Sequence, residues 1–231
     1  GLSAAAPSVA LASDGVAMVS FARTILDTNA QARRYFAGST MRERIRLGAS
    51  DNFVRSQLPQ VLHDFQMRMP TVDLELTVGL SGDLFDRLDA GELDLVLGKR
   101  RPGEDRGQLI RREEMVWIGT ETTSVDEDGP VPLVMFPPPS MSRAMAIEAL
   151  DRAQQPWRIV CTCDGLMGLM AATLGGFGVM VQPRSMIPAG LVEVPPSHRL
   201  PPIGAVEFVV ASASRHLHGP IAELAAAVLR H

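Results

Sequence analysis

The stretch LSGDLFDRLDAGELDLVLG, Leu80–Gly98, contains the two patterns that decide the fold. Its first half has apolar residues three and four positions apart, which predicts an amphipathic helix that Ser81 or Asp83 caps and Gly91 ends. Its last six residues, Leu93–Gly98, are apolar at nearly every position. Such a strand is buried on both faces, as parallel strands are. The stretch therefore predicts a helix and a strand of an α/β protein.

The preceding residues extend this unit to a β-α-β-α-β order over Arg44–Gly98. Apolar residues alternate in Arg44–Ser50, which predicts a strand. The helix after it begins at Asp51, its expected cap, and is expected to kink at Pro59. Apolar and polar residues alternate cleanly in Val72–Val78, which indicates an exposed or edge strand.

The same order recurs in the second half of the chain, with elements of similar length. Its strands are expected at Val131–Phe136, Trp157–Thr162 and Phe177–Val181. Ser140 or Ser142 opens the first helix between them, and Asp164 caps the second. The repetition indicates two similar α/β lobes.

Two extended segments, Gly107–Gly119 and Gly204–Ser214, connect these lobes, and an amphipathic helix follows at Gly219–Arg230. Because the chain crosses twice, its last part returns to the first lobe. We expect an α/β fold of two Rossmann-like lobes joined by two crossover strands, with a cleft between them. The expected segments are 41–99 and 212–231 for lobe I, 100–119 and 203–211 for the crossover strands, and 120–202 for lobe II.

A long helix is predicted before the first lobe, over about Asp14–Phe36. Its apolar stripe has little adjacent sequence to pack against, so we expect it to pair with a second copy in a homodimer or homotetramer, with Asn29 setting the register. The alternative is an ordinary helix packed on its own domain. The expected dimerisation face consists of Met18, Phe21, Ala22, Ile25, Asn29 and Ala32.

The composition favours a globular, cytoplasmic protein without a cofactor. The 231 residues are 46% hydrophobic and 21% charged, and a net charge of −4 does not favour binding of nucleic acid or anionic membranes by this chain. The apolar runs are too short to span a membrane. The two cysteines, Cys161 and Cys163, are expected as buried thiols, although a redox-sensing pair stays open. No nucleotide-binding, hydrolase or metalloprotease motif occurs, so we expect neither an enzyme nor a metal site.

Several long stretches carry a resemblance to a known family. The effector-binding domain of LysR-type transcriptional regulators is similar to IRLGASDNFVRSQLPQVLHDFQMRMPTVDLELTVGLSGDLFDRLDAGELDLVLG, Ile45–Gly98. A later part of that domain resembles GLMGLMAATLGGFGVMVQP, Gly165–Pro183, and the family's linker helix resembles VALASDGVAMVSFARTILDTNAQA, Val9–Ala32. The branch that includes regulators of motility and virulence looks closest to LVMFPPPSMSRAMAIEALDRAQQPWRIV, Leu133–Val160.

The resemblance implies the fold of type 2 periplasmic binding proteins, preceded by a linker helix. It implies that a small-molecule effector binds between the lobes and changes how the subunits are arranged. The family's winged helix-turn-helix is absent from this sequence, in which residues 1–40 would hold only a wing remnant and the linker helix. The parent protein is therefore expected to bind DNA, whereas this chain is not. The alternatives are a periplasmic solute-binding protein of a transport system and an enzyme on the same frame.

In such a fold the ligand lies outside the carboxyl ends of the strands, where the N-termini of helices meet. This rule predicts effector contacts from both lobes, at Ser50, Asp51, Asn52, Phe53, Leu80, Ser81, Phe136, Pro137, Arg143, Gly165, Leu166, Val181 and Gln182. The crossover supplies Gly98 and Lys99 as hinge residues. For Ser81 the alternative is a cap of its own helix, and for Phe53 and Phe136 it is packing in the core.

The expected effector is a small carboxylate or an aromatic compound. Arg143 is the candidate that binds a carboxylate, because a guanidinium at a helix start can form paired hydrogen bonds; a solvated arginine is the alternative. Phe53 and Phe136 would line the pocket of an apolar ligand. Pro137–Pro139 makes its loop stiff and poor in N–H donors, so that loop is expected to shape the pocket by its contour.

Overall fold

The computed structural model describes residues 43–126, 128–214 and 217–231, together with residues 18, 21, 22, 25, 26, 28 and 29. The chain forms two compact units, Gly1–Arg42 and Glu43–His231. In the first unit, the described residues of the predicted dimerisation face are all helical and exposed: Met18, Phe21, Ala22, Ile25 and Asn29. Ala32, the last residue of that face, lies outside the described residues.

The second unit begins with the predicted β-α-β-α-β order. Its elements are β1 (Glu43–Ala49), α2 (Asp51–Arg55), α3 (Leu58–Arg68), β2 (Val72–Val78), α4 (Ser81–Asp89) and β3 (Leu95–Arg100). The expectation of one kinked helix was wrong, because α2 and α3 are separate. Pro59 lies in the first turn of α3, where a helix does not use the missing N–H, so the chain starts a new helix there instead of bending one.

The second half repeats the order after the long strand β4 (Gln108–Gly119). It contains β5 (Val131–Met135), α5 (Met141–Arg152), β6 (Trp157–Thr162), α6 (Leu166–Leu174), β7 (Met180–Pro183), η1 (Arg184–Met186), β8 (Val192–Glu193), β9 (Gly204–Ser212) and α7 (Gly219–Arg230). The strand expected at Phe177–Val181 begins only at Met180. Gly176 has a positive φ of 77° and Phe177 is exposed, so both still belong to the turn after α6.

The strands form a seven-stranded sheet in the order β2-β1-β3-β9-β4-β7, with β8 on β4, and a separate parallel pair of β5 and β6. β1 is parallel to β2 and β3, whereas β9 is antiparallel to β3 and β4. β4 pairs with β9 through Gln108–Met115 and with β7 through Met115–Ile118. The sheet is therefore continuous only through the two crossing strands.

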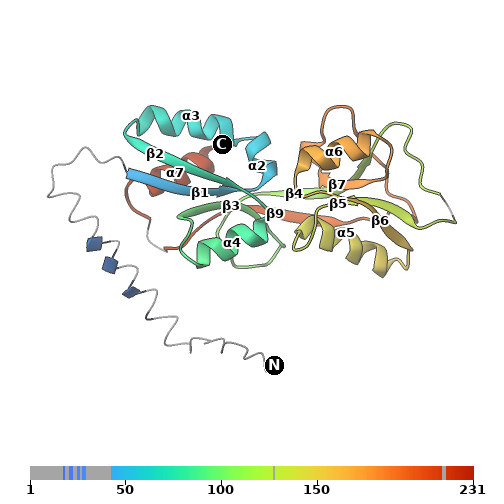
Figure 1. Ribbon diagram of the computed structural model, residues 1–231, viewed down its shortest axis with the longest axis horizontal. Helices are drawn as coiled ribbons and strands as arrows, with labels where there is room; N and C mark the ends of the chain where they lie inside the picture. The colour runs from blue at the N-terminus through green and yellow to red at the C-terminus, as the bar shows by residue number, and fades with distance from the viewer. Residues whose placement is uncertain are drawn as a thin grey trace, which may run out of the picture. The chain divides into compact units, whose positions relative to one another are not determined.

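Figure 1 shows the two groups of elements that β4 and β9 connect. Lobe I contains β1–β3, α2–α4 and α7, and lobe II contains β5–β7, α5 and α6. In lobe I, α3 and α7 pack on one face of the sheet and α4 on the other. This arrangement confirms the predicted α/β class with two crossover strands.

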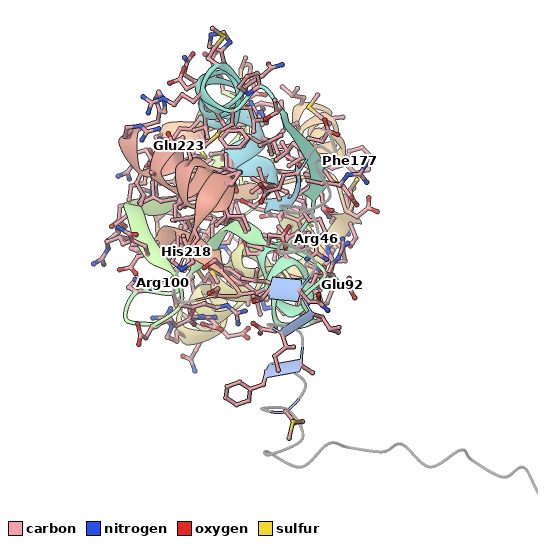
Figure 2. The ribbon with its side chains drawn as sticks, turned by 90° about the vertical axis from the view of Figure 1, so that its left-hand side faces the viewer. Arg46, Glu92, Arg100, Phe177, His218 and Glu223 are labelled. Atoms are coloured by element: carbon pink, nitrogen blue, oxygen red, sulfur yellow. The ribbon has the colours of Figure 1, made fainter. Side chains whose placement is uncertain are left out.

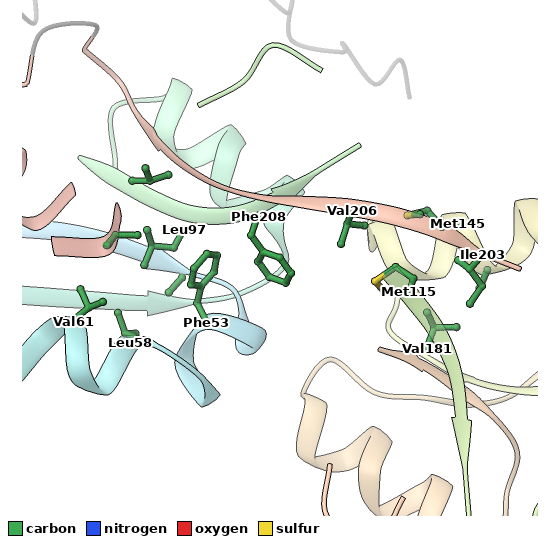
Figure 3. Close-up of a cluster of buried hydrophobic side chains, with 14 of the residues drawn as sticks. Phe53, Leu58, Val61, Leu97, Met115, Met145, Val181, Ile203, Val206 and Phe208 are labelled. Atoms are coloured by element: carbon green, nitrogen blue, oxygen red, sulfur yellow. The ribbon is translucent and has the colours of Figure 1, made fainter. Parts of the chain in front are cut away.

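The main core runs from lobe I through the crossing strands into lobe II (Figure 3). Phe53 of α2 and Phe208 of β9 form its centre, with an edge-to-face contact of 5.2 Å between ring centroids. Val206 and Met115 continue the core along the crossing strands towards Val181 of β7. β3 is buried along almost its full length, as its apolar sequence predicted.

β2 lies at the edge of the sheet, which confirms the predicted edge strand. Its residues Leu76 and Val78 are 40% and 45% exposed. The surface of lobe I also carries many charged side chains, of which Figure 2 labels Arg46, Glu92, Arg100 and Glu223. Within the described ranges, no helix combines the length and the hydropathy that crossing a bilayer requires.

The predicted helix caps are only partly correct. Ser140 caps α5, since its Oγ accepts from the N–H of Arg143. Among the described residues, α2, α4 and α6 begin without a side-chain cap, so Asp51, Ser81 and Asp164 do not cap them and neither does Asp83. The Ser81 hydroxyl instead accepts a 3.0 Å hydrogen bond from the N–H of Lys99. The side chain thus ties the start of α4 to β3.

Gly98→Ala is expected to lower the free energy of unfolding by about 1–3 kcal/mol through overpacking. A Cβ at Gly98 would lie 2.8 Å from Cζ of the Phe85 ring, which packs across the strand. Urea unfolding of both proteins measures the difference. The matched control is Gly165→Ala, where an added Cβ meets nothing within 4 Å; equal effects of the two changes would contradict the packing argument.

Candidate functional site

A small cavity lies between the lobes, at the carboxyl ends of β1, β2, β3 and β5. Its volume is about 20 Å³, which is room for about one water molecule. The residues that line it are Ser50, Asp51, Asn52, Gly79, Leu80, Ser81, Lys99, Phe136, Ser140, Met141 and Ser142. Both lobes therefore contribute to the cavity, and the starts of α2, α4 and α5 meet there.

Among the residues that the structure describes, Lys99 is the only basic side chain that lines the cavity. The residue is 9% exposed, and its Nζ donates a 2.9 Å hydrogen bond to Oδ1 of Asn52. Burial lowers the pKa of Lys99 to about 8, while the negative charge of Asp51 opposes this shift. None of the ion pairs in the described part of the chain includes Lys99. Among the described residues, the cavity wall thus holds a buried cation that forms no ion pair, while the carboxylate of Asp51 lines the same cavity.

Hydroxyl and backbone donors surround this cation. The buried Ser50 hydroxyl has no hydrogen-bond partner among the residues that the structure describes. The first N–H groups of α4 have no intrahelical acceptor, as at every helix start, and they carry the positive end of the helix dipole. On lobe II, the hydroxyls of Ser140 and Ser142 lie 3.1 Å apart. The arrangement is suited to a small anion.

A buried amide pair connects the lobes next to this cavity. Nδ2 of Asn52, on α2, donates to Oε1 of Gln182, on β7, over 2.9 Å. Both residues are buried, and 130 positions separate them in the sequence. Gln182, one of the predicted effector contacts, is therefore hydrogen-bonded to a residue that lines the cavity, but it is not among the lining residues itself.

The structure brings together about half of the predicted effector contacts. Those that line the cavity are Ser50, Asp51, Asn52, Leu80, Ser81 and Phe136. Phe53, Leu166 and Val181 are buried in hydrophobic clusters instead, and neither Pro137 nor Gly165 is among the cavity residues. The guanidinium of Arg143 donates to the carbonyl oxygen of Phe136 over 3.2 Å.

The predicted hinge residues lie in β3, where Gly98 pairs with Val209 and Lys99 with Phe208 of the crossing strand β9. The sequence interpretation gave Lys99 only as a hinge residue, and its effector contacts did not include four further residues that line the cavity, Gly79, Ser140, Met141 and Ser142. One signal for Lys99 was present, because it is the only lysine among the 22 basic residues of the sequence.

The two thiols are less buried than expected. Cys161 and Cys163 are both free and only partly buried. Cys161 lies in β6, which has a hydrogen-bonded neighbour on one side only among the described strands, and Cys163 follows the end of that strand. Within the described ranges, no group of three histidine, cysteine or carboxylate side chains is placed to hold a metal ion.

The family model of the LysR substrate binding domain matches residues 38–231. Among curated proteins, the regulator DgdR of Burkholderia cepacia is 29% identical over 224 residues, which cover 96% of this chain and 76% of DgdR. PecT of Dickeya dadantii is 27% identical, with 77% of this chain and 56% of PecT covered. Both are named HTH-type transcriptional regulators, and this chain spans only part of their length.

Solved structures show the same fold at low sequence identity. The regulatory domain of CcmR from Synechocystis PCC6803, in complex with 2-PG, has a TM-score of 0.65 and 17% identity, with 81% of this chain and 96% of that chain covered. The effector binding domain of QuiR in complex with shikimate has a TM-score of 0.61 and 12% identity, with coverage of 81% and 95%. These likenesses confirm the predicted type 2 periplasmic-binding fold.

The fold, the cleft at the strand ends and the family match agree with one another. Transcriptional regulators are not an enzyme class, and the match favours a regulator over a solute-binding protein of a transport system. The chain belongs to the LysR substrate-binding domain family and is the effector-sensing domain of a LysR-type transcriptional regulator.

Proposed function

We propose that the cavity binds a small organic anion, and that a carboxylate is its preferred group. The observation that carries this proposal is the buried ammonium of Lys99 at the cavity wall, without an ion-pair partner among the described residues. A carboxylate there would gain charge-assisted hydrogen bonds from Lys99 and further ones from Ser50 and the start of α4. Arg143 would contribute only after leaving the carbonyl of Phe136, so Lys99 replaces it as the main candidate.

The cavity is too small for an organic acid in the closed arrangement. About 20 Å³ holds one water molecule, whereas ligand pockets usually measure several hundred Å³. Binding therefore requires that the lobes move apart about the crossing strands β4 and β9. A ligand then changes the balance between lobe arrangements by its difference in affinity for them.

The change in lobe arrangement would alter DNA binding through the other parts of the parent protein. We assign residues 1–40 to a wing remnant and dimerisation helix, 41–99 and 212–231 to lobe I, 100–119 and 203–211 to the crossing strands, and 120–202 to lobe II. Met18, Phe21 and Ile25 are each about two-thirds exposed in the single chain, which supports pairing with a second copy. The parent would act in the cytoplasm as a dimer or tetramer and bind DNA through its helix-turn-helix.

Carboxylate affinity is expected to fall roughly tenfold between pH 7 and pH 9. The ammonium form of Lys99 binds the anion, and with a pKa of about 8 this form is lost as the pH rises through that window. Calorimetric titration with benzoate, whose carboxyl group is ionised throughout, measures the change. Lys99→Arg serves as the control because arginine keeps its charge, so its affinity should stay level.

Benzamide tests the proposal itself, since it matches benzoate in shape and carries no charge. Shikimate, a larger carboxylate, tests the size of the opened cleft. We expect benzoate or shikimate to bind. Benzamide should bind at least tenfold more weakly than benzoate, because it lacks the charge that strengthens the hydrogen bond from Lys99. Equal binding of benzoate and benzamide would contradict an anion site.

A further inference from the structure

A chain of buried polar side chains runs from the crossing region to both lobes. Lys99 of β3 donates to Oδ1 of Asn52 on α2, and Nδ2 of Asn52 donates to Oε1 of Gln182 on β7, each over 2.9 Å. All three residues are at most 9% exposed. An ammonium can only donate hydrogen bonds, so Lys99 fixes the oxygen of the Asn52 amide towards itself. The amide nitrogen must then face Gln182 of the other lobe.

Two further contacts close the same cleft from outside. Arg101, after β3, forms a two-point ion pair with Glu148 of α5, at 2.9 Å and 2.6 Å. At the start of α4, the backbone of Gly82 lies against Pro139, whose Cγ would be 3.5 Å from an added Cβ. The ion pair is exposed and therefore contributes little. The buried amide bond is the stronger link, because a buried polar group that loses its partner is left without water to replace it.

We propose that Lys99, Asn52 and Gln182 form a latch that holds the lobes together when no effector is bound. This inference rests on the proposed function, because it concerns how the same cleft is regulated. The closed cleft holds no more than a water molecule, so an effector binds only after the Asn52–Gln182 hydrogen bond opens. The latch thus lowers the apparent affinity in proportion to the fraction of chains that are open. It sets the threshold of effector concentration at which the domain responds.

The test measures the distance between the lobes without any ligand. Nitroxide labels are attached through Gln66→Cys on α3 and Ala171→Cys on α6, both exposed positions, after Cys161→Ser and Cys163→Ser remove the native thiols. Pulsed electron spin resonance then gives the distribution of label distances. The native chain is expected to give one narrow distribution of distances. Gln182→Met removes the hydrogen-bond acceptor at similar volume, and this variant is expected to give a broader distribution centred at a longer distance.

Two controls separate the latch from general destabilisation. Gln155→Met removes an amide of lobe II that accepts from Arg199, and it should leave the distance unchanged. Asn52→Leu removes the donor of the same inter-lobe hydrogen bond and should open the cleft as well, which keeps the test valid should Gln182→Met fold poorly. Native-like distances in every folded latch variant would overturn the proposal.

Benzoate affinity supplies the second readout. Gln182→Met should bind benzoate roughly two- to tenfold more tightly than the native chain, because one hydrogen bond no longer opposes opening. An open but equally tight variant would refute the coupling between latch and affinity. If neither benzoate nor shikimate binds the native chain, the anion site is refuted, while the distances still decide about the latch.

Discussion

Phe208→Ala is expected to lower the free energy of unfolding by about 3–5 kcal/mol, the usual cost of removing a fully buried ring. Phe208 has no exposed surface and lies in β9, one of the two strands that cross between the lobes. Its ring packs edge-to-face on Phe53, and the guanidinium of Arg111 lies 4.9 Å from its centroid. The alanine variant would lose these contacts and leave a cavity where the lobes join.

Urea unfolding followed by circular dichroism measures the effect. Phe177→Ala is the matched control, because this phenylalanine is 60% exposed; surface changes of that kind usually shift stability by about 0.5 kcal/mol or less. Similar losses in the two variants would show that Phe208 does not anchor the core. A variant that unfolds in two separate steps would show that the lobes no longer fold as one unit.

Lys99→Met is expected to weaken benzoate binding roughly 10- to 100-fold, the range for a lost hydrogen bond to a charged group. The methionine fills a similar volume and removes the one cation that the described residues place in the cavity wall. The melting temperature should change little, because the relief of burying a charge, which lowers the pKa of Lys99, offsets the loss of its buried hydrogen bond to Asn52. Loss of affinity without loss of stability is the signature of a binding residue.

Arg152→Met is the charge-matched control, since Arg152 is an exposed cation of α5 outside the cavity. Its benzoate affinity should equal that of the native chain at moderate salt, where distant surface charges are screened. An equal loss in both variants would mean that net charge, and not the position of Lys99, governs binding. Unaltered affinity in Lys99→Met would remove the lysine from the site.

The local patterns of the sequence predicted the elements well, and they failed where two local signals compete. Leu93–Gly98 is apolar on both faces and forms the buried strand β3, because both sides of a central strand lose water. Ser81 shows the opposite case. Serine before an amphipathic stretch usually caps the helix, but its hydroxyl accepts from the backbone of Lys99 instead. The donor, the N–H of Lys99, is 18 positions away in the sequence, so the residues around Ser81 do not indicate it.

The sequence predicted which loops form the candidate site, but it did not predict which side chain supplies the positive charge there. The rule that ligands bind at the carboxyl ends of strands selected Ser50, Asn52 and Ser81, which follow from element order alone. Arg143 looked like the cation of the site because of its place near a helix start. Its guanidinium is bound to a backbone carbonyl, and Lys99, expected as a hinge residue, faces the cavity.

The sequence by itself determined the α/β order, the two lobes with their crossing strands and the edge position of β2, because hydrophobic periodicity and turn residues act over a few neighbouring positions. Only the tertiary structure decided which polar groups meet between the lobes. Asn52 and Gln182 are 130 residues apart, and Lys99 owes its lowered pKa to the elements that exclude water around it. Burial and pairing of polar groups depend on the whole packed chain, so no short stretch specifies them.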